Sequence, residues 1–154
     1  MKKFLSLLLF AGVATMPMLA NTTDDHDNRL YFTIDSSTDL SRVPISFQLE
    51  NPTISITAVE MYLTLPAGVE IVSSQLAERV ESTHQITDGD TSHGYFVSVA
   101  SEAVDAFVGT DGTICTLICD FSKLQDGDYS ISASGMFAVG VDNESVTCYT
   151  ASDQ

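Results

Sequence analysis

One stretch, residues 56–72 (ITAVEMYLTLPAGVEIV), constrains the fold of this chain more than any other. Apolar residues alternate with other residues through its first half: Val59, Met61, Leu63 and Leu65. Successive side chains of a strand point to opposite faces of a sheet, so this period of two is typical of a strand with one buried face. Pro66 lacks the N–H that a ladder needs, and Gly68 permits a turn. The stretch therefore predicts a strand, a tight corner and a second strand.

The same alternation recurs along the chain between clusters of turn-forming residues. The predicted strands lie at 30–34, 43–50, 56–65, 69–72, 95–99, 114–121, 129–133 and 146–150. The irregular part, residues 73–92, is predicted to hold a short helix or an extended edge, followed by a loop at 87–92 (TDGDTS). About eight or nine strands with no convincing long helix favour an all-β antiparallel sandwich or barrel.

The alternation also predicts which side chains face the core. The inward set is Val59, Met61, Leu63, Tyr95, Val97, Val99, Cys115, Leu117 and Cys119. The outward set is Glu60, Tyr62, Thr64, Phe96, Ser98, Ile114, Thr116 and Ile118.

The first 20 residues have the order of a secretory signal peptide. Lys2 and Lys3 precede an apolar run at 4–13, and small residues follow near Ala20. This run is too short to span a bilayer comfortably, so we expect no transmembrane segment in the mature chain. The predicted division is a signal peptide at 1–20, an acidic flexible leader at 21–28 and one β-sandwich domain at 29–151. The predicted location is secreted, periplasmic or on the cell surface.

The mature chain is strongly acidic. All 21 Asp and Glu lie beyond residue 20, whereas two of the six basic residues lie before it, so the mature charge is 4 − 21 = −17. Such a charge repels nucleic acid at long range and favours solubility. We therefore expect no nucleic-acid partner.

Three cysteines are too few for a disulfide-built scaffold. Cys115 and Cys119 are four residues apart in a predicted strand, so their Cα atoms should lie roughly 13 Å apart, too far for a bridge. One of them could pair with Cys148. The favoured interpretation is that they are small buried apolar residues.

The order of motifs resembles a known family. VPISFQLEN, ITAVEMYLTLPAGV, YFVSVAS, DGTICTLICDF and DGDYSIS follow one another between residues 30 and 150. This order is similar to the cohesin-type domain, which shares its fold with a group of bacterial carbohydrate-binding modules, and above all to versions secreted by gut and oral Bacteroidetes. The resemblance implies an antiparallel jelly-roll β-sandwich of nine strands and a non-catalytic binding role.

The resemblance also implies where a partner binds. Cohesins bind a calcium-loaded dockerin on one open sheet face, and in this fold the strands around Tyr62, Phe96 and Ile118 are expected to share that sheet. The candidate partner-binding residues are Glu60, Tyr62, Thr64, Phe96 and Ile118. Exposed apolar patches mark protein–protein surfaces. The alternative is that loops cover this face or that the aromatic residues are merely scattered.

Two other functions stay open. A carbohydrate-binding module of the same fold would stack sugars on aromatic side chains, but the chain has no Trp and would have to use Tyr31, Tyr62, Tyr129 and Tyr149. A structural subunit of a surface assembly would present an unpaired edge strand, at 30–35 or 146–150. The predicted partner is a protein, dockerin-like or a surface component, or else a polysaccharide.

The acidic loops are candidate cation sites, because carboxylate oxygens are the ligands that Ca²⁺ prefers. The candidate metal residues are Asp105, Asp111, Asp126 and Asp128. Asp-Gly pairs are above all turn formers, and no loop has the spacing of a helix–loop–helix calcium site. We expect no cofactor, with Ca²⁺ as the alternative.

No arrangement of residues suggests catalysis. His26, His84 and His93 are isolated from one another and from any Cys in a ligand-like spacing, and no G-x-S-x-G or Cys-His motif supports a nucleophile. We predict no enzyme and no catalytic residue.

Overall fold

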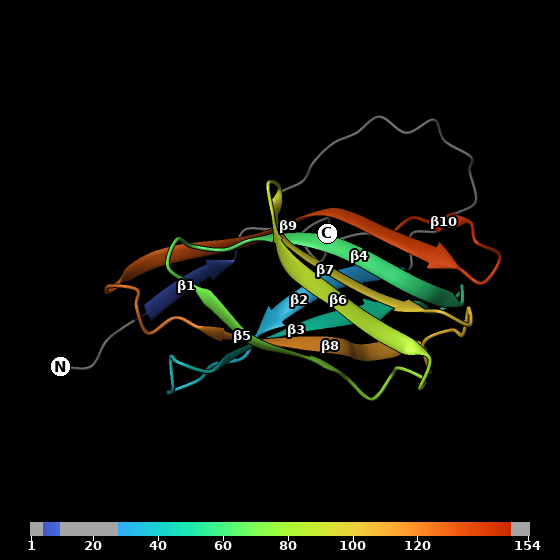
Figure 1. Ribbon diagram of the computed structural model, residues 1–154, viewed down its shortest axis with the longest axis horizontal. Coiled ribbons are helices and arrows are strands. Elements are labelled where there is room, and N and C mark those ends of the chain that lie inside the picture. Colours follow the sequence, from blue (N-terminus) through green and yellow to red (C-terminus); the bar gives the residue numbers. More distant parts are fainter. Residues whose placement is uncertain (1–4, 10–27, 149–154) are drawn as a thin grey trace.

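Strands follow the alternating segments along the chain (Figure 1). The computed structural model describes residues 5–9 and 28–148. Its strands are β1 (Leu5–Leu9), β2 (Arg29–Ile34), β3 (Val43–Glu50), β4 (Ile56–Thr64), β5 (Glu70–Leu76), β6 (His84–Thr91), β7 (Gly94–Ser101), β8 (Asp111–Asp120), β9 (Gly127–Gly140) and β10 (Ser145–Val146). Across these described ranges, no helix has the length and apolar character needed to cross a membrane.

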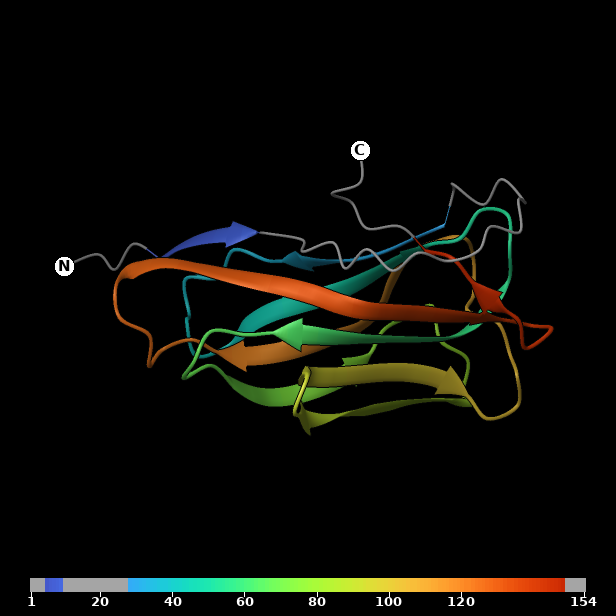
Figure 2. The ribbon, with the colours of Figure 1, turned by 90° about the horizontal axis from the view of Figure 1, so that it is seen from above.

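The strands form two sheets packed face to face (Figure 2). One sheet has the order β1-β9-β4-β7-β6, with β10 also paired to β9, and the other has the order β2-β3-β8-β5. The pairs are antiparallel except for β1 with β9, which is parallel. The predicted all-β jelly-roll sandwich is confirmed.

Alternating apolar side chains from both sheets fill the space between them. The largest fully buried side chains are Phe47, Phe121, Leu30, Ile45, Leu49, Ile56, Met61, Leu63, Ile114, Leu117, Ile131 and Val99. Each such burial contributes roughly 1.5–3 kcal/mol relative to exposure. The predicted inward set is confirmed apart from Tyr95, which is only partly buried.

Two of the cysteines belong to this core. Cys115 and Cys119 are free thiols that are at most 1% exposed. Burial raises the pKa of both thiols to about 12. They are therefore small apolar packing residues, as predicted, and neither forms a bridge to Cys148.

The prediction of a loop at residues 87–92 is wrong, because β6 runs through most of this segment and pairs with β7 along its length. The turn-forming residues are tolerated since Asp88 has partners inside the sandwich. Its carboxylate accepts hydrogen bonds from the hydroxyl of Tyr95 and, at 3.0 Å, from Ser74 Oγ of β5. Burial and this carboxylate raise the pKa of Tyr95.

Ile114 was predicted to face outward and is fully buried, so this prediction is wrong. The pairing of β3 with β8 slips at this point: Phe47 lies opposite Cys115, whereas Gln48 lies opposite Thr113. Ile114 is the extra residue of the resulting bulge, which is why the simple alternation assigns it to the wrong side.

The ends of the chain are described only in part. Leu5–Leu9, inside the predicted signal peptide, forms β1 beside the first half of β9. Residues 10–27, which include most of the predicted leader, lie outside the described residues, as do residues 149–154. Of the predicted last strand at 146–150, only Val146 lies in β10, residues 147–148 are not in a strand, and residues 149–150 lie outside the described residues.

One buried arginine side chain forms hydrogen bonds that connect the loops at one end of the sandwich. Arg79, in the loop between β5 and β6, is 5% exposed. Its guanidinium donates hydrogen bonds to Val108 O (2.6 Å), Asn51 Oδ1 (2.7 Å), Gly109 O (2.9 Å) and Leu49 O. Burial lowers the pKa of the guanidinium, and the charge of Asp111 opposes this shift.

We expect Arg79→Met to lower the free energy of unfolding by about 3 kcal/mol or more, because several buried acceptors would lose a charged donor at once. Equilibrium unfolding in urea measures this change. Arg42→Met is the control, since Arg42 is exposed in a turn and its replacement should cost no more than about 0.5 kcal/mol. Equal effects of the two substitutions would contradict the role given to Arg79.

Candidate functional site

The outward side of the β9-β4-β7-β6 sheet forms a continuous surface, here called the outer face. Cross-strand partners share one side of a sheet, so the register defines its members. They are Ala58, Glu60, Tyr62 and Thr64 of β4, Gln85, Thr87, Gly89 and Thr91 of β6, Phe96, Ser98 and Ala100 of β7, and Ser132, Ser134, Phe137 and Val139 of β9.

The outer face is almost uncharged, although the chain carries 21 acidic residues. Glu60 is its only charged member, and the others are small, hydroxylated or apolar. The strands contain three other acidic residues. Asp88 turns into the sandwich, Asp90 lines a cavity at its end, and Asp128 lies in the part of β9 that extends beyond β4. The area where the four strands pair is thus nearly neutral on a strongly acidic protein.

An aromatic cluster lies on this surface. The ring of Tyr62 lies 5.2 Å from that of Phe96, with the planes tilted by 47°, and 6.0 Å from the exposed ring of His93 in an edge-on arrangement. Phe137, on the neighbouring strand, is 43% exposed and lies opposite Glu60. Aromatic side chains are enriched in protein interfaces, where charged residues are depleted.

Gly135 makes room for Tyr62. It adopts φ +59°, a left-handed conformation that glycine tolerates best, and a Cβ there would lie 2.8 Å from Cδ2 of the tyrosine ring. The pairing of β4 with β9 slips at this point, because Tyr62 lies opposite Ser134 while Glu60 lies opposite Phe137. This bulge seats the ring over the backbone of β9 and shifts the alternation of β9 by one residue.

The structure brings together four of the five predicted partner-binding residues. Glu60, Tyr62, Thr64 and Phe96 lie on adjacent strands of the outer face. Ile118 does not join them, because β8 belongs to the four-stranded sheet on the other side of the core. The expectation that its strand shares a sheet with β4 and β7 is therefore wrong.

Two aromatic side chains of this cluster, Phe137 and His93, were not predicted from the sequence. Phe137 lies in the second half of β9, beyond the predicted end of that strand. Its signal in the sequence is a change of phase: the buried residues Ile131 and Ala133 are followed, after Gly135, by buried Ala138. His93 lies in the turn between β6 and β7, and its position over Tyr62 depends on the pairing of these strands.

A cavity of about 670 Å³ opens at the end of the sandwich, between the corner at 65–69 and the β6–β7 hairpin. Its wall includes Thr64 and Thr91 of the outer face, so the two features are continuous. The remaining lining is mixed, with the aliphatic residues of the corner on one side and the carboxylate of Asp90 on the other.

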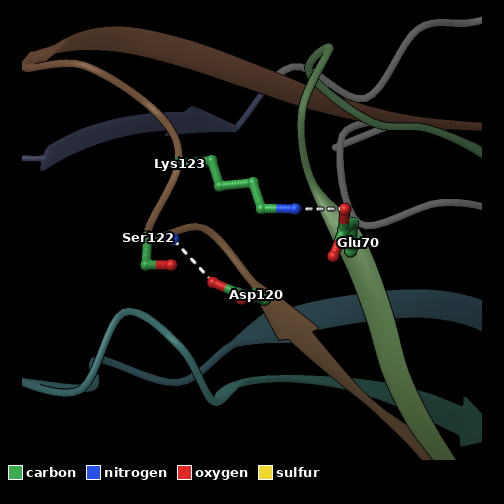
Figure 3. Close-up of polar contacts among 4 residues, drawn as sticks. All are labelled: Glu70, Asp120, Ser122 and Lys123. Atoms are coloured by element: carbon green, nitrogen blue, oxygen red, sulfur yellow. Dashed lines mark hydrogen bonds and ion pairs between the residues drawn. The ribbon is translucent and has the colours of Figure 1, made fainter.

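Glu70, which lines the cavity, forms an exposed ion pair with Lys123 (Figure 3). Lys123, in the loop between β8 and β9, donates to Glu70 at the start of β5. This hydrogen bond raises the pKa of the lysine. The backbone N–H of Ser122 donates to Asp120 at 2.8 Å. Hydrogen bonding from the Ser122 side chain, together with this backbone bond, lowers the pKa of that aspartate.

The four candidate metal residues fall into two separate pairs. Asp111 begins β8, whereas Asp126 and Asp128 follow its end, and a strand of this length spans about 30 Å. Asp105 lies before β8 and accepts a hydrogen bond from Thr83 Oγ1 at 2.6 Å. Among the described residues, no three His, Cys, Asp or Glu side chains are grouped so that they could hold a metal ion.

The histidines do not form a reactive group. His84 is 3% exposed and stacks on Phe107 at 4.6 Å, and its Nδ1 accepts a hydrogen bond from the backbone N–H of Glu81. His93 is exposed beside Tyr62. His26 lies outside the described residues.

No protein-family model matches the sequence, and no curated protein is similar to it in sequence. Several solved structures of similar fold are cohesin modules. A non-cellulosomal cohesin from Archaeoglobus fulgidus has a TM-score of 0.63 at 14% identity, over 80% of this chain and 86% of that chain. The sixth cohesin of scaffoldin B from Acetivibrio cellulolyticus, solved with a dockerin, has a TM-score of 0.65 at 15% identity, over 81% and 94%.

A cohesin from Clostridium thermocellum, also solved with a dockerin, has a TM-score of 0.59 at 12% identity, over 86% of this chain and 94% of that chain. At these identities the likeness concerns the fold. The chain thus has a cohesin-like fold, as the order of its sequence motifs predicted.

We expect Gly135→Ala to lower the free energy of unfolding by about 1–3 kcal/mol, because the new Cβ both strains the backbone and meets the ring of Tyr62. Urea unfolding measures the loss. Gly89→Ala is the matched control on the same face, since a Cβ there meets nothing within 4 Å. If both substitutions lower the free energy of unfolding equally, Gly135 does not determine the position of the Tyr62 ring.

Proposed function

We propose that this protein is a non-catalytic binding module that captures a protein partner on its outer face. The observation that carries the proposal is the nearly uncharged surface around Tyr62 and Phe96 on a chain with 21 acidic residues. Interface centres are poor in charged residues and rich in aromatic ones. The similar cohesins solved with dockerins support a protein as the partner.

The mechanism follows from the geometry of the sheet. Four paired strands present the side chains on a rigid backbone, so little conformational entropy is lost on binding. Tyr62, Phe96 and Phe137 would supply most of the affinity, since a few aromatic anchors dominate most interfaces. The acidic surroundings would favour a basic or calcium-bearing partner and speed its approach.

A glycan ligand is the weaker alternative. Sugar stacking needs a flat aromatic platform, but the rings of Tyr62 and Phe96 are tilted by 47°. Tyr31 lies in the opposite sheet and Tyr129 near the start of β9, so the described tyrosines do not form a row on the outer face. The outer face is therefore better suited to a protein than to a sugar chain.

The proposal places the module outside the cytoplasm, after removal of residues 1–20. Any calcium in the complex would be carried by a dockerin-like partner, because the described aspartates at the two ends of β8 form no group of three ligands. The structural subunit of a surface assembly stays a third candidate, which capture experiments separate from the first two.

The test is capture by the immobilised protein from the secreted and envelope fraction of its own organism, with and without calcium. We expect a specific protein to be retained, and Tyr62→Ala or Phe96→Ala to weaken its capture at least about tenfold, because aromatic anchors carry 2 kcal/mol or more. Both residues are only partly buried, so the loss of stability should stay near 1 kcal/mol.

Tyr31→Ala is the matched control, because Tyr31 is a partly buried tyrosine on the outward side of the opposite sheet. It should leave capture unchanged. Equal loss with Tyr31→Ala, or severe destabilisation by the other two variants, would contradict the assignment of the face. Retained polysaccharide would favour the glycan alternative, and an empty column the structural subunit.

A further inference from the structure

The outer edge of β9 is paired in an unusual way. Along residues 132–140, β9 pairs with β4, which ends where Thr64 lies opposite Ser132. The preceding residues, Gly127–Ile131, extend beyond β4. Among the described residues their strand partner is β1, which runs parallel to them from Leu5 opposite Gly127 to Leu9 opposite Ile131 (Figures 1 and 2).

The segment that fills this edge is apolar and lies in the predicted signal peptide. β1 has the sequence LSLLL, inside the 20 residues that we expect to be removed on export. The buried apolar residues between Leu30 and Ala138 form a core that stays in the chain after this removal. Removal of β1 would leave without a strand partner those backbone N–H and C=O groups of Gly127–Ile131 that point toward it, which belong to alternate residues.

An open edge of this kind accepts another strand unless the sequence blocks it. The usual blocks are proline, lysine and inward-pointing charges. β9 has no proline and no lysine in its 14 residues, and Asp128 is its only charged residue. The edge is therefore left without the protection that natural edge strands usually have.

We propose that Gly127–Ile131 is a strand-acceptor site, which binds an extended apolar peptide segment parallel to β9. Residues 5–9 fill the site before export, and an apolar segment of a partner protein fills it afterwards. The site uses backbone groups at the sheet edge, so it is separate from the outer face and goes beyond the function proposed above.

The first test compares amide hydrogen exchange in full-length Leu7→Pro and Leu7→Ala proteins. Proline removes a ladder N–H and disrupts β1, whereas alanine keeps the strand backbone. We expect alternate amides of residues 127–131 to exchange at least about tenfold faster in Leu7→Pro only. Unchanged exchange would overturn the proposal. Protection in β3 and β8 reports that the variant is folded, and a chain with Gly and Ser throughout residues 5–9 replaces it if it is not.

The second test adds a synthetic peptide of residues 2–10 (KKFLSLLLF) to the Leu7→Pro protein. We expect the peptide to restore the slow exchange at 127–131. Alternate N–H groups of a strand point to opposite sides, and N-methylation removes the donor. Of two peptides, one N-methylated at residues 5, 7 and 9 and the other at residues 6 and 8, only one should therefore restore the slow exchange. Equal activity of both peptides, or no protection by either, would overturn the proposal.

This outcome is independent of the capture experiment. Tyr62→Ala in the Leu7→Pro background should leave peptide binding unchanged. Tyr62 belongs to β4 and lies opposite Ser134, which is in the other half of β9. Loss of peptide binding in that variant would show that the peptide binds the outer face and would contradict an edge site.

Discussion

The sandwich depends on one buried guanidinium at the end where its loops cross. Three connections pass from one sheet to the other at this end: β3 to β4, β5 to β6 and β7 to β8. Arg79 belongs to the second and donates to acceptors in the other two, Asn51 and Val108 among them. A guanidinium has five donors in a fixed fork and here binds four acceptors, whereas a lysine ammonium has only three donors.

This arrangement separates the stability of the sandwich from the proposed binding function. The connections at the Arg79 end and the core between the sheets hold the strands in place. The side chains on the outward side of the β9-β4-β7-β6 sheet take part in neither the connections nor the core. They can be small, hydroxylated or aromatic without a cost to the core. Gly135 serves this surface locally, because the absence of a side chain there leaves room for the ring of Tyr62.

The sequence predicts the buried faces well, because alternation is a local property. Val59, Met61 and Leu63 are buried as expected, and so the outward positions of Glu60 and Tyr62 follow. Features that depend on strand pairing are not predicted in this way. Ile118 has the right alternation but belongs to the other sheet, and Ile114 is displaced by a bulge.

Local composition also gives a wrong secondary structure where tertiary contacts stabilise a strand made of turn-forming residues. The segment TDGDTS has the residues of a loop, yet it is a strand because Asp88 finds two hydroxyl donors inside the sandwich. Arg79 has no local signal at all, since its acceptors come from residues roughly 30 positions away on either side.

The central claim is that a protein partner binds the outer face, and site-specific photo-crosslinking tests it most directly. A photoreactive residue would replace Ser98, in the middle of the outer face, or Ser46, which is on the outward side of β3 in the opposite sheet. We predict a crosslink to the captured partner from position 98 and none from position 46. A crosslink from position 46 alone would contradict the account.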